Sequence, residues 1–493
     1  MLLATTCSFA AAGSLRAQGD LAQKSQEATQ AMHAGHFAAA VALYRELVQA
    51  LPDNPGLRLD LGLALHSENK YREAIVQFQA AARHQPDLEP SWLMLGLTYL
   101  ELDQPRDAIN PLECALRLDP SDERARLQLA GADLSLKKPE EATREYQKVT
   151  DADPGNPKAW QGLGLSYAAA SRQTFAMLEK EAPDSAYHDV LLAQSLTTRG
   201  QDRTAFYWYR QALAKDSHFP GVHAALAQIY RRSGHPDWES VEESREHENG
   251  NPDCSQKSPE CEFLAGRFSE VVTMAGRDER PQSLYWKAQA FEQLSAQALD
   301  RLAAMPPSPE VHELMAQADA TKGDARAAIE EWKEALKLAP DAPNLKQGLA
   351  YALWLDGDYP QAEPLLIQMV ELHPESAEIH FELGNSLLAM GSAEKAIPEL
   401  ERAVKLNPAL APAQASLGRA YLRAGRPQDA VPHLKAGLAS DVRGTALYEL
   451  AQAYKATGQK ALGDATLRKF QQTSTAALER SAQMDREHEI TAP

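Results

Sequence analysis

Two cysteines, Cys254 and Cys261, are the residues whose type and spacing best suit a specific chemistry. Six residues separate them, in a segment that also contains Pro252 and Pro259. In an exported protein this arrangement favours a disulfide that closes a small loop, with a loop-entropy contribution of roughly 2 to 3 kcal/mol. Two free thiols are an alternative. A metal site that includes His247 is another, although a structural site usually needs four ligands.

The other patterns that could support catalysis or metal binding are incomplete. His312-Glu313 lacks the second histidine, four residues after the first, that a zinc-protease helix requires. Gly162-Leu163-Gly164 has no third glycine and lies in a helical context, where glycine serves packing. The sequence has no Gly-x-Ser-x-Gly elbow and no Gly-Lys-Ser/Thr loop. We therefore predict no catalytic residue, no metal site and no cofactor, and we expect that the protein is not an enzyme.

A proline that recurs every 34 residues in two runs sets the organisation of the chain. These closing prolines are Pro52, Pro86, Pro120 and Pro154, and then Pro340, Pro374 and Pro408. Twelve residues before each proline stands an alanine: Ala40, Ala74, Ala108, Ala142, Ala328, Ala362 and Ala396. Eight residues before it stands a bulky residue: Tyr44, Phe78, Leu112, Tyr146, Trp332, Leu366 and Leu400. Because proline cannot continue a helix, the pattern predicts helical hairpins, which must stack to bury their apolar faces.

Leucine-glycine pairs mark the first helix of five of these hairpins. They are Leu61-Gly62, Leu95-Gly96, Leu163-Gly164, Leu383-Gly384 and Leu417-Gly418. We expect each glycine to face the second-helix alanine, so that the two helices approach closely. Together these positions resemble the tetratricopeptide repeat. The resemblance implies an all-α fold, a right-handed superhelical solenoid of antiparallel helix pairs, whose surfaces bind partners instead of forming catalytic pockets.

The repeats suggest five segments along the chain. We predict a signal peptide at residues 1–17, an N-terminal repeat lobe at 21–232 and an irregular helical midsection at 233–280. A C-terminal repeat lobe follows at 281–477, and a charged cap at 478–493. Residues 157–185 look like a shortened hairpin with its turn before Phe175, and Ser283 to Ala304 like an abbreviated one. One continuous superhelix with diverged middle repeats is equally compatible with the sequence.

Charge and hydropathy limit the possible partners and locations. The formal net charge is -18 and no long basic run occurs, which argues against a nucleic-acid partner. No stretch approaches the length of a membrane span. The apolar segment from Met1 to Ala17 indicates export, with a cleavage point after Ala17, so we expect a periplasmic or secreted protein. If the segment is not a signal, the protein is cytoplasmic.

In the family that the chain resembles, first helices line a concave groove, and this assigns candidate partner-binding residues. The early groove residues are Leu59, Leu63, Leu93, Leu97 and Leu127. The late groove residues are Tyr351, Trp354, Phe381, Asn385 and Arg419. Phe381 and Ser416 stand where chaperone-docking members carry Lys and Asn, so that carboxylate clamp is not expected. Leucines that lie outside the core would form an apolar binding stripe, unless a tight superhelix, the N-terminal segment or a second copy covers them.

These observations predict a non-catalytic scaffold that binds a peptide or protein partner in the groove of its repeats. An accessory subunit of envelope polysaccharide assembly or secretion is the alternative function. A regulatory arm of an enzyme is a third, which the lack of a second domain disfavours. The sequence specifies neither the partner nor the oligomeric state.

Overall fold

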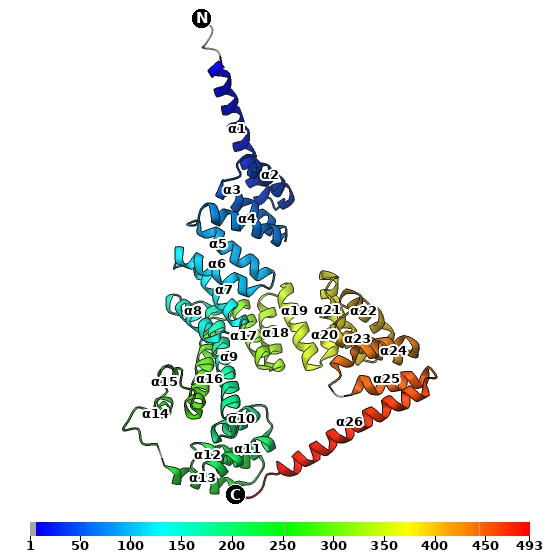
Figure 1. Ribbon diagram of the computed structural model, residues 1–493. Helices are drawn as coiled ribbons and strands as arrows, with labels where there is room; N and C mark the ends of the chain where they lie inside the picture. Colours follow the sequence, from blue (N-terminus) through cyan, green and yellow to red (C-terminus); the bar gives the residue numbers. More distant parts are fainter. Residues whose placement is uncertain (1–5, 251, 443) are drawn as a thin grey trace. The chain divides into compact units, whose positions relative to one another are not determined.

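The computed structural model describes residues 6–250, 252–442 and 444–493, and the regular structure in these ranges is helical (Figure 1). The predicted signal peptide, residues 1–17, lies partly outside them. The first nine helices are α1 (Thr6–His33), α2 (Phe37–Ala50), α3 (Pro55–Ser67), α4 (Tyr71–His84), α5 (Glu89–Glu101), α6 (Pro105–Leu118), α7 (Glu123–Ser135), α8 (Pro139–Ala152) and α9 (Pro157–Glu181). The next seven are α10 (Ala186–Thr198), α11 (Asp202–Lys215), α12 (Val222–Arg232), α13 (Pro236–Asn249), α14 (Pro259–Leu264), α15 (Phe268–Ala275) and α16 (Pro281–Ala303). The remaining helices are α17 (Pro309–Lys322), α18 (Ala325–Leu338), α19 (Pro343–Asp356), α20 (Tyr359–Leu372), α21 (Ala377–Ala389), α22 (Ala393–Leu406), α23 (Ala411–Arg423), α24 (Pro427–Gly437), the 3₁₀ turn η1 (Leu438–Ser440), α25 (Thr445–Ala456) and α26 (Lys460–Glu487).

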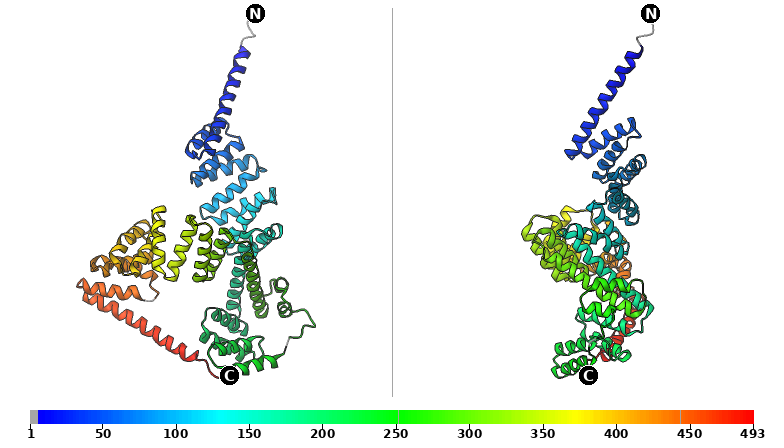
Figure 2. Two further views of the ribbon diagram at one scale, coloured as in Figure 1. Left: turned by 180° about the vertical axis from the view of Figure 1, so that it is seen from behind. Right: turned by 90° about the vertical axis from the view of Figure 1, so that its left-hand side faces the viewer.

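The chain forms two compact units. Unit 1 comprises residues 1–173 together with 291–301, and unit 2 comprises residues 174–290 together with 302–493. The lobe boundaries that the sequence predicts, at 232 and 281, do not coincide with this division. Within each unit, consecutive helices pack as hairpins, for example α3 with α4 and α5 with α6 in unit 1, and α21 with α22 and α23 with α24 in unit 2 (Figure 2). The predicted all-α array of helix pairs is confirmed.

The two rows of repeated side chains form the core of the hairpins. The second-helix alanines from Ala40 to Ala396 are fully buried, and their bulky partners are at most 9% exposed. A Cβ added to the glycines of the leucine-glycine pairs would meet a bulky side chain first, and on Gly96 and Gly384 it would also lie 3.5 and 3.3 Å from the carbonyl of the alanine, so the predicted pairing holds only in part. A Cβ on Gly62 would lie 2.5 Å from the ring of Phe78, and one on Gly384 would lie 2.6 Å from Cγ of Leu400. Glycine therefore makes the space that the bulky side chain fills, and the alanine four residues earlier lets the backbones approach.

Each hairpin turn depends on one residue in the left-handed conformation. In unit 1 this residue is Gly35, Asn69, Asp103 or Lys137, each 34 residues after the last. In unit 2 the same spacing relates Gly323, Gly357, Gly391 and Gly425. Only glycine adopts this conformation without a steric cost. The turns of α3–α4, α5–α6 and α7–α8 are therefore strained in a way that the later turns are not.

A second recurring contact closes the turn between hairpins. Six residues after six of the seven closing prolines, a side-chain nitrogen lies within hydrogen-bond distance of that proline's carbonyl oxygen. We call these side chains the turn donors: Arg58, Trp92, Arg126, Trp160, His380 and Gln414. The Nε1 atoms of Trp92 and Trp160 both donate at 2.9 Å. These bonds satisfy a carbonyl that the helix ladder cannot reach.

Some turn donors also bond to the second helix of their own hairpin. Arg126 lies 2.7 Å from the Glu145 carboxylate, and His380 Nδ1 lies 2.7 Å from the Glu399 carboxylate. In both pairs the partner is nineteen residues further along the chain. One side chain thus joins the preceding turn to both helices of its repeat.

The two abbreviated hairpins predicted at 157–185 and 283–304 are instead the long single helices α9 and α16. In unit 1 they pack on each other, although they are far apart in sequence. Ser295 Oγ donates to the Gly164 carbonyl at 2.8 Å, and a Cβ on Gly164 would lie 2.8 Å from Leu299. Each helix therefore finds its partner in the other, which makes an internal turn unnecessary.

Candidate functional site

The first helices of neighbouring repeats form one continuous face in each array. In unit 1, α3 contacts α5 and α5 contacts α7; in unit 2, α19 contacts α21, α21 contacts α23 and α23 contacts α25. Second helices make no comparable contacts among themselves in the described part of the chain. The first helices are therefore drawn together on the inner side of each array, and their side chains line that face.

Three aromatic residues lie together on this face in unit 2. The Tyr351 and Trp354 rings of α19 stack with their centroids 5.9 Å apart and an interplanar angle of 25°. Phe381 of α21 meets the Trp354 ring edge-on at 5.7 Å. Trp354 and Phe381 pack against the core, whereas Tyr351 is 46% exposed. The core therefore holds an aromatic platform whose outer ring faces solvent.

A line of hydrogen bonds continues from the aromatic platform across three first helices. Trp354 Nε1 donates to Asn385 Oδ1 at 3.2 Å, and Asn385 Nδ2 donates to Ser416 Oγ at 3.2 Å. Each bond joins two residues that are 31 positions apart and lie on successive first helices. We call this line the polar ladder. On the next step Arg419 Nε donates to the Glu449 carboxylate at 2.7 Å.

The late groove residues of the sequence prediction therefore lie together. Tyr351, Trp354 and Phe381 make the aromatic platform, and Asn385 belongs to the polar ladder. Arg419 is paired with Glu449 and three-quarters buried, with 26% of its side chain exposed. Ser416, which the sequence marked only as a departure from the chaperone clamp, proves to be a member of the ladder. The repeat gave no signal for this contact, because Ser416 lies 31 and not 34 residues from Asn385 and so has a different repeat position.

A carboxyl group next to the platform has an altered acidity. Burial, and to a smaller extent the nearby Glu378 carboxylate, raises the pKa of Glu382 to about 7. Desolvation disfavours the charged form of a carboxyl group, and a like charge adds to the effect. Glu382, which follows Phe381 in the chain, therefore changes its protonation state near neutral pH.

The early groove leucines of unit 1 do not form an exposed stripe. Leu59 and Leu63 are partly buried and pack against the hydrophobic core of α2–α5, and Leu93 packs against that of α6 and α7. Leu127 is also partly buried. Leu97 is only 8% exposed, so the expectation that it lies outside the core is wrong. The reason is that α5 touches both neighbouring first helices, which leaves little of its inner side open.

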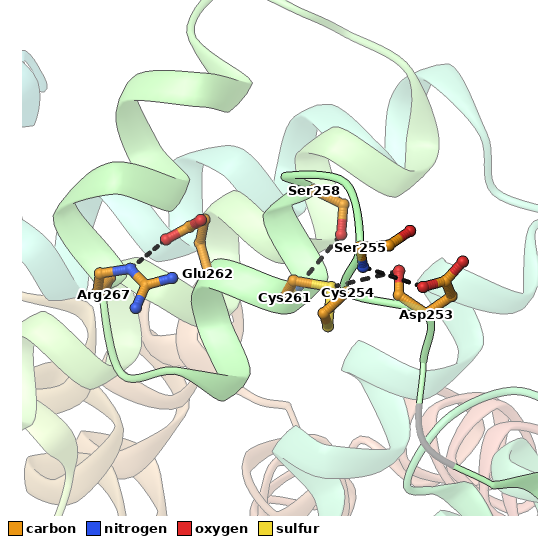
Figure 3. Close-up of a disulfide and its surroundings, with 7 residues drawn as sticks. All are labelled: Asp253, Cys254, Ser255, Ser258, Cys261, Glu262 and Arg267. Atoms are coloured by element: carbon orange, nitrogen blue, oxygen red, sulfur yellow. Dashed lines mark hydrogen bonds and ion pairs between the residues drawn. A yellow bond between two sulfur atoms is a disulfide. The ribbon is translucent and has the colours of Figure 1, made fainter.

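Cys254 and Cys261 are joined by a disulfide, with their Cα atoms 5.6 Å apart (Figure 3). The bond ties the segment before α14 to its first turn, where Ser258 Oγ accepts from the Cys261 amide at 3.2 Å. Glu262 is almost fully buried and pairs with Arg267, whose guanidinium lowers the pKa of Glu262. The α14–α15 hairpin is thus held by a covalent bond and by an ion pair.

Across the described ranges, no three His, Cys, Asp or Glu side chains are grouped so that they could hold a metal ion. Among the described helices, none combines the length and the apolar character needed to cross a bilayer.

Individual known proteins resemble this chain only in part. The arginine–tRNA ligase of Pyrococcus abyssi is 32% identical over 73 residues, which make up 15% of this chain and 11% of the ligase. The chain thus spans about a tenth of the length of that curated relative. The MamA structure from Desulfovibrio magneticus is 23% identical, with a TM-score of 0.29, over 30% of this chain and 82% of that one. A tetratricopeptide repeat protein from Parabacteroides merdae is 11% identical, with a TM-score of 0.30, over 68% and 98% of the respective chains.

Family models match a much larger share of the chain. Two models, both described as tetratricopeptide repeat, match residues 31–97, 99–165 and 387–453 and residues 313–366 and 349–412. These ranges cover more than half of the 493 residues and fall on the hairpins with the 34-residue spacing. The chain therefore belongs to the tetratricopeptide repeat family, a family of protein-interaction scaffolds.

Proposed function

We propose that this chain is a non-catalytic scaffold and that the first helices α19–α25 of unit 2 bind an extended segment of a protein partner. The exposure of Tyr351 is the observation that carries the proposal. A large ring that is 46% exposed and stacked on the partly buried Trp354, which Phe381 meets in turn, offers apolar area whose position is already fixed. Rigid aromatic residues of this kind contribute strongly to protein interfaces because little side-chain entropy is lost on binding.

The polar ladder supports an extended ligand next to the platform. An amide side chain can donate two hydrogen bonds and accept two. Asn385 uses one donor for Ser416 and one acceptor site for Trp354. It therefore keeps one of each for the backbone of a bound segment. The platform would contact an apolar or planar side chain of that segment, and the ladder would orient its main chain.

The test is a peptide selection followed by measured affinities. Peptides selected on the wild-type chain from a random display library would be titrated by calorimetry against wild type, Tyr351→Ala and Ile367→Ala. Ile367 is the matched control, because it is 44% exposed but lies on the second helix α20. We expect Tyr351→Ala to weaken binding at least fivefold, as for an aromatic interface anchor, and Ile367→Ala to leave it unchanged. Equal affinities for the two variants would refute the assignment.

We also propose that the protein is exported. The apolar segment from Met1 to Ala17 and the Cys254–Cys261 disulfide support this, because disulfides persist mainly in oxidising compartments. An accessory role in envelope polysaccharide assembly or secretion would follow if the partner segment came from that machinery. Fractionation of cells that express the chain, with mass spectrometry of unreduced peptides, tests the location. Recovery in the cytoplasm with two free thiols would contradict export.

A further inference from the structure

Burial resumes at the end of an exposed helix in unit 2. Every described side chain from Thr475 to Glu487, the last half of α26, is exposed. The next residue, His488, is only 7% exposed. Beyond it, Glu489 is exposed, Ile490 is half-buried and Thr491 is exposed. His488 is the C-cap of α26, and the alternation that continues from it through Thr491 has the period of two that is typical of an extended segment lying on a surface.

The buried residues of this segment contact α11 and α12. The His488 ring lies on the Tyr207 ring, with the centroids 4.5 Å apart. Ile490 packs against the hydrophobic cluster that includes Phe206, Tyr209 and Tyr230. The Tyr230 hydroxyl donates to the backbone carbonyl of Thr491 at 2.7 Å. In both views of Figure 2 the end of the chain lies beside these helices.

We propose that α11 and α12 carry a second segment-binding site, distinct from the face of α19–α25, and that residues 488–491 of the same chain occupy it. The site takes an extended segment with an aromatic or imidazole side chain followed two residues later by a branched aliphatic one. A main-chain carbonyl one residue further accepts a hydrogen bond. The occupant is thus an internal ligand, held in place by α26.

The sequence separation of these contacts distinguishes a ligand from ordinary core packing. In a repeat solenoid each unit contacts its neighbours, so contacts link residues that are close in sequence. Tyr230 and Thr491, however, are 261 positions apart. Every described side chain in the connecting half of α26 is exposed, so residues 488–491 are tethered to the site but are not part of a repeat stack.

The contacts also indicate how the site selects its ligand. Tyr230 is fully buried, and Phe206 and Trp238 hold its ring edge-to-face at 5.7 and 5.5 Å. Its hydroxyl therefore presents a fixed donor to any main-chain carbonyl in the right place. Alternate side-chain pockets supply the specificity, as in other recognition of extended peptides. Tyr207 belongs to the second helix of the α10–α11 hairpin and Tyr230 to the first helix of the α12–α13 hairpin, so the site combines a second helix with the next first helix.

The experiment empties the site in the full-length chain and supplies the segment from outside. A fluorescent peptide of residues 485–493 is titrated against wild type and against the double variant His488→Ser with Ile490→Ser. The control variant, Glu489→Ser with Thr491→Ser, changes two exposed side chains of the same segment. We expect the double variant to bind the peptide with a Kd of about 0.1 mM or tighter, because a segment that stays bound at a roughly millimolar effective concentration must have a Kd well below that concentration. Wild type and the control should bind it at least tenfold more weakly, since their own segment competes.

Two further measurements make the result decisive. Adding Tyr230→Phe to the double variant should weaken peptide binding about two- to tenfold, the effect of one hydrogen bond. The double variant should not bind a peptide that carries Ile490→Ser but should still bind one that carries Glu489→Ser. This difference would show that alternate side chains of the segment make the contacts. Equal peptide binding by wild type and the double variant, or no binding up to about 1 mM, would overturn the proposal. A dimer of the wild type that the double variant lacks would overturn the intramolecular assignment, because the segment would then occupy a second copy.

Discussion

Replacing Gly96 by alanine should destabilise the α5–α6 hairpin although alanine is the better helix former. A Cβ at this position would lie 2.6 Å from Cγ and 2.7 Å from Cδ2 of Leu112. Leu112 is fully buried and cannot turn away, so the two helices must move apart. Overpacking of this kind costs roughly 1 to 3 kcal/mol, and the helix propensity of alanine offsets about 1 kcal/mol of it. Because the overlap is with the buried Cγ of Leu112, we take the upper half of that cost and expect a net loss of roughly 1 to 2 kcal/mol in the free energy of unfolding.

Gly131 provides the matched control in the next repeat. It lies inside α7, and the nearest atom to an added Cβ is the Tyr146 hydroxyl at 3.6 Å, an ordinary contact. Gly131→Ala should therefore be neutral or stabilising by up to about 1 kcal/mol, the propensity term alone. The two variants make the same chemical change in successive first helices and should move stability in opposite directions.

The assay must report on individual repeats because solenoids can unfold locally. Hydrogen exchange resolved to α5 and α6, together with guanidinium unfolding, measures the local and the global effect. In a Leu112→Ala background the clash disappears, so Gly96→Ala should cost much less there than in wild type. A Gly96→Ala variant that is as stable as wild type, or equal costs in both backgrounds, would refute this account of the hairpin.

Three other predictions concern the turns, the buried carboxyl group and the disulfide. Lys137→Gly should raise the free energy of unfolding by roughly 0.5 to 1 kcal/mol. Glycine relieves the left-handed strain at this position, and its greater conformational entropy in the unfolded chain cancels part of that stabilisation. Denaturant midpoints measure the effect, and a lower midpoint for the variant would contradict the strain. Glu382 binds a proton in the folded state up to about pH 7, whereas in the unfolded state it loses that proton near its usual pKa of 4.5. The contribution of Glu382 to folding stability is therefore complete below pH 4.5 and declines as the pH rises to 7. Glu382→Gln should raise the melting temperature at pH 8 but not at pH 4.5. An equal rise at both pH values would exclude this titration. Cys254→Ser should lower the local stability of α14 by about 2 kcal/mol, which would appear as faster hydrogen exchange. If exchange is unchanged in the variant, and reductant does not change it in the wild type either, the disulfide does not constrain this loop.

The sequence alone predicts the hairpins well, because their signals repeat at a fixed spacing. The rows that contain Ala108 and Leu112 are buried as expected. The prediction for Gly96 named Ala108 but missed the closer Leu112, for a geometric reason. Spacing shows which residues share a repeat position. Two residues that are four apart, such as Ala108 and Leu112, lie on the same face of a helix, and spacing does not show which of them points into the space left by a glycine.

Three other features of the structure could not be predicted from the types of the residues involved. The turn donors include Arg58, Trp92 and His380, whose common property is a nitrogen at the end of a long side chain. The packing of α9 on α16 joins Gly164 to Ser295 across 131 residues, and no period predicts a contact of that range. Residues 478–493 were predicted only as a charged cap, because two buried side chains in an otherwise polar segment do not form a recognisable pattern.

The distance in sequence between Tyr230 and Thr491 also has a consequence for the newly made chain. Helical hairpins can fold as soon as both helices have left the ribosome, because their contacts are local. The segment that covers Tyr230 is synthesised 261 residues later. At about 5 to 20 residues per second, the site on α11 and α12 stays open for roughly ten to fifty seconds during synthesis. Throughout that interval the nascent protein presents a folded binding site without its internal ligand, and a competing segment could enter first.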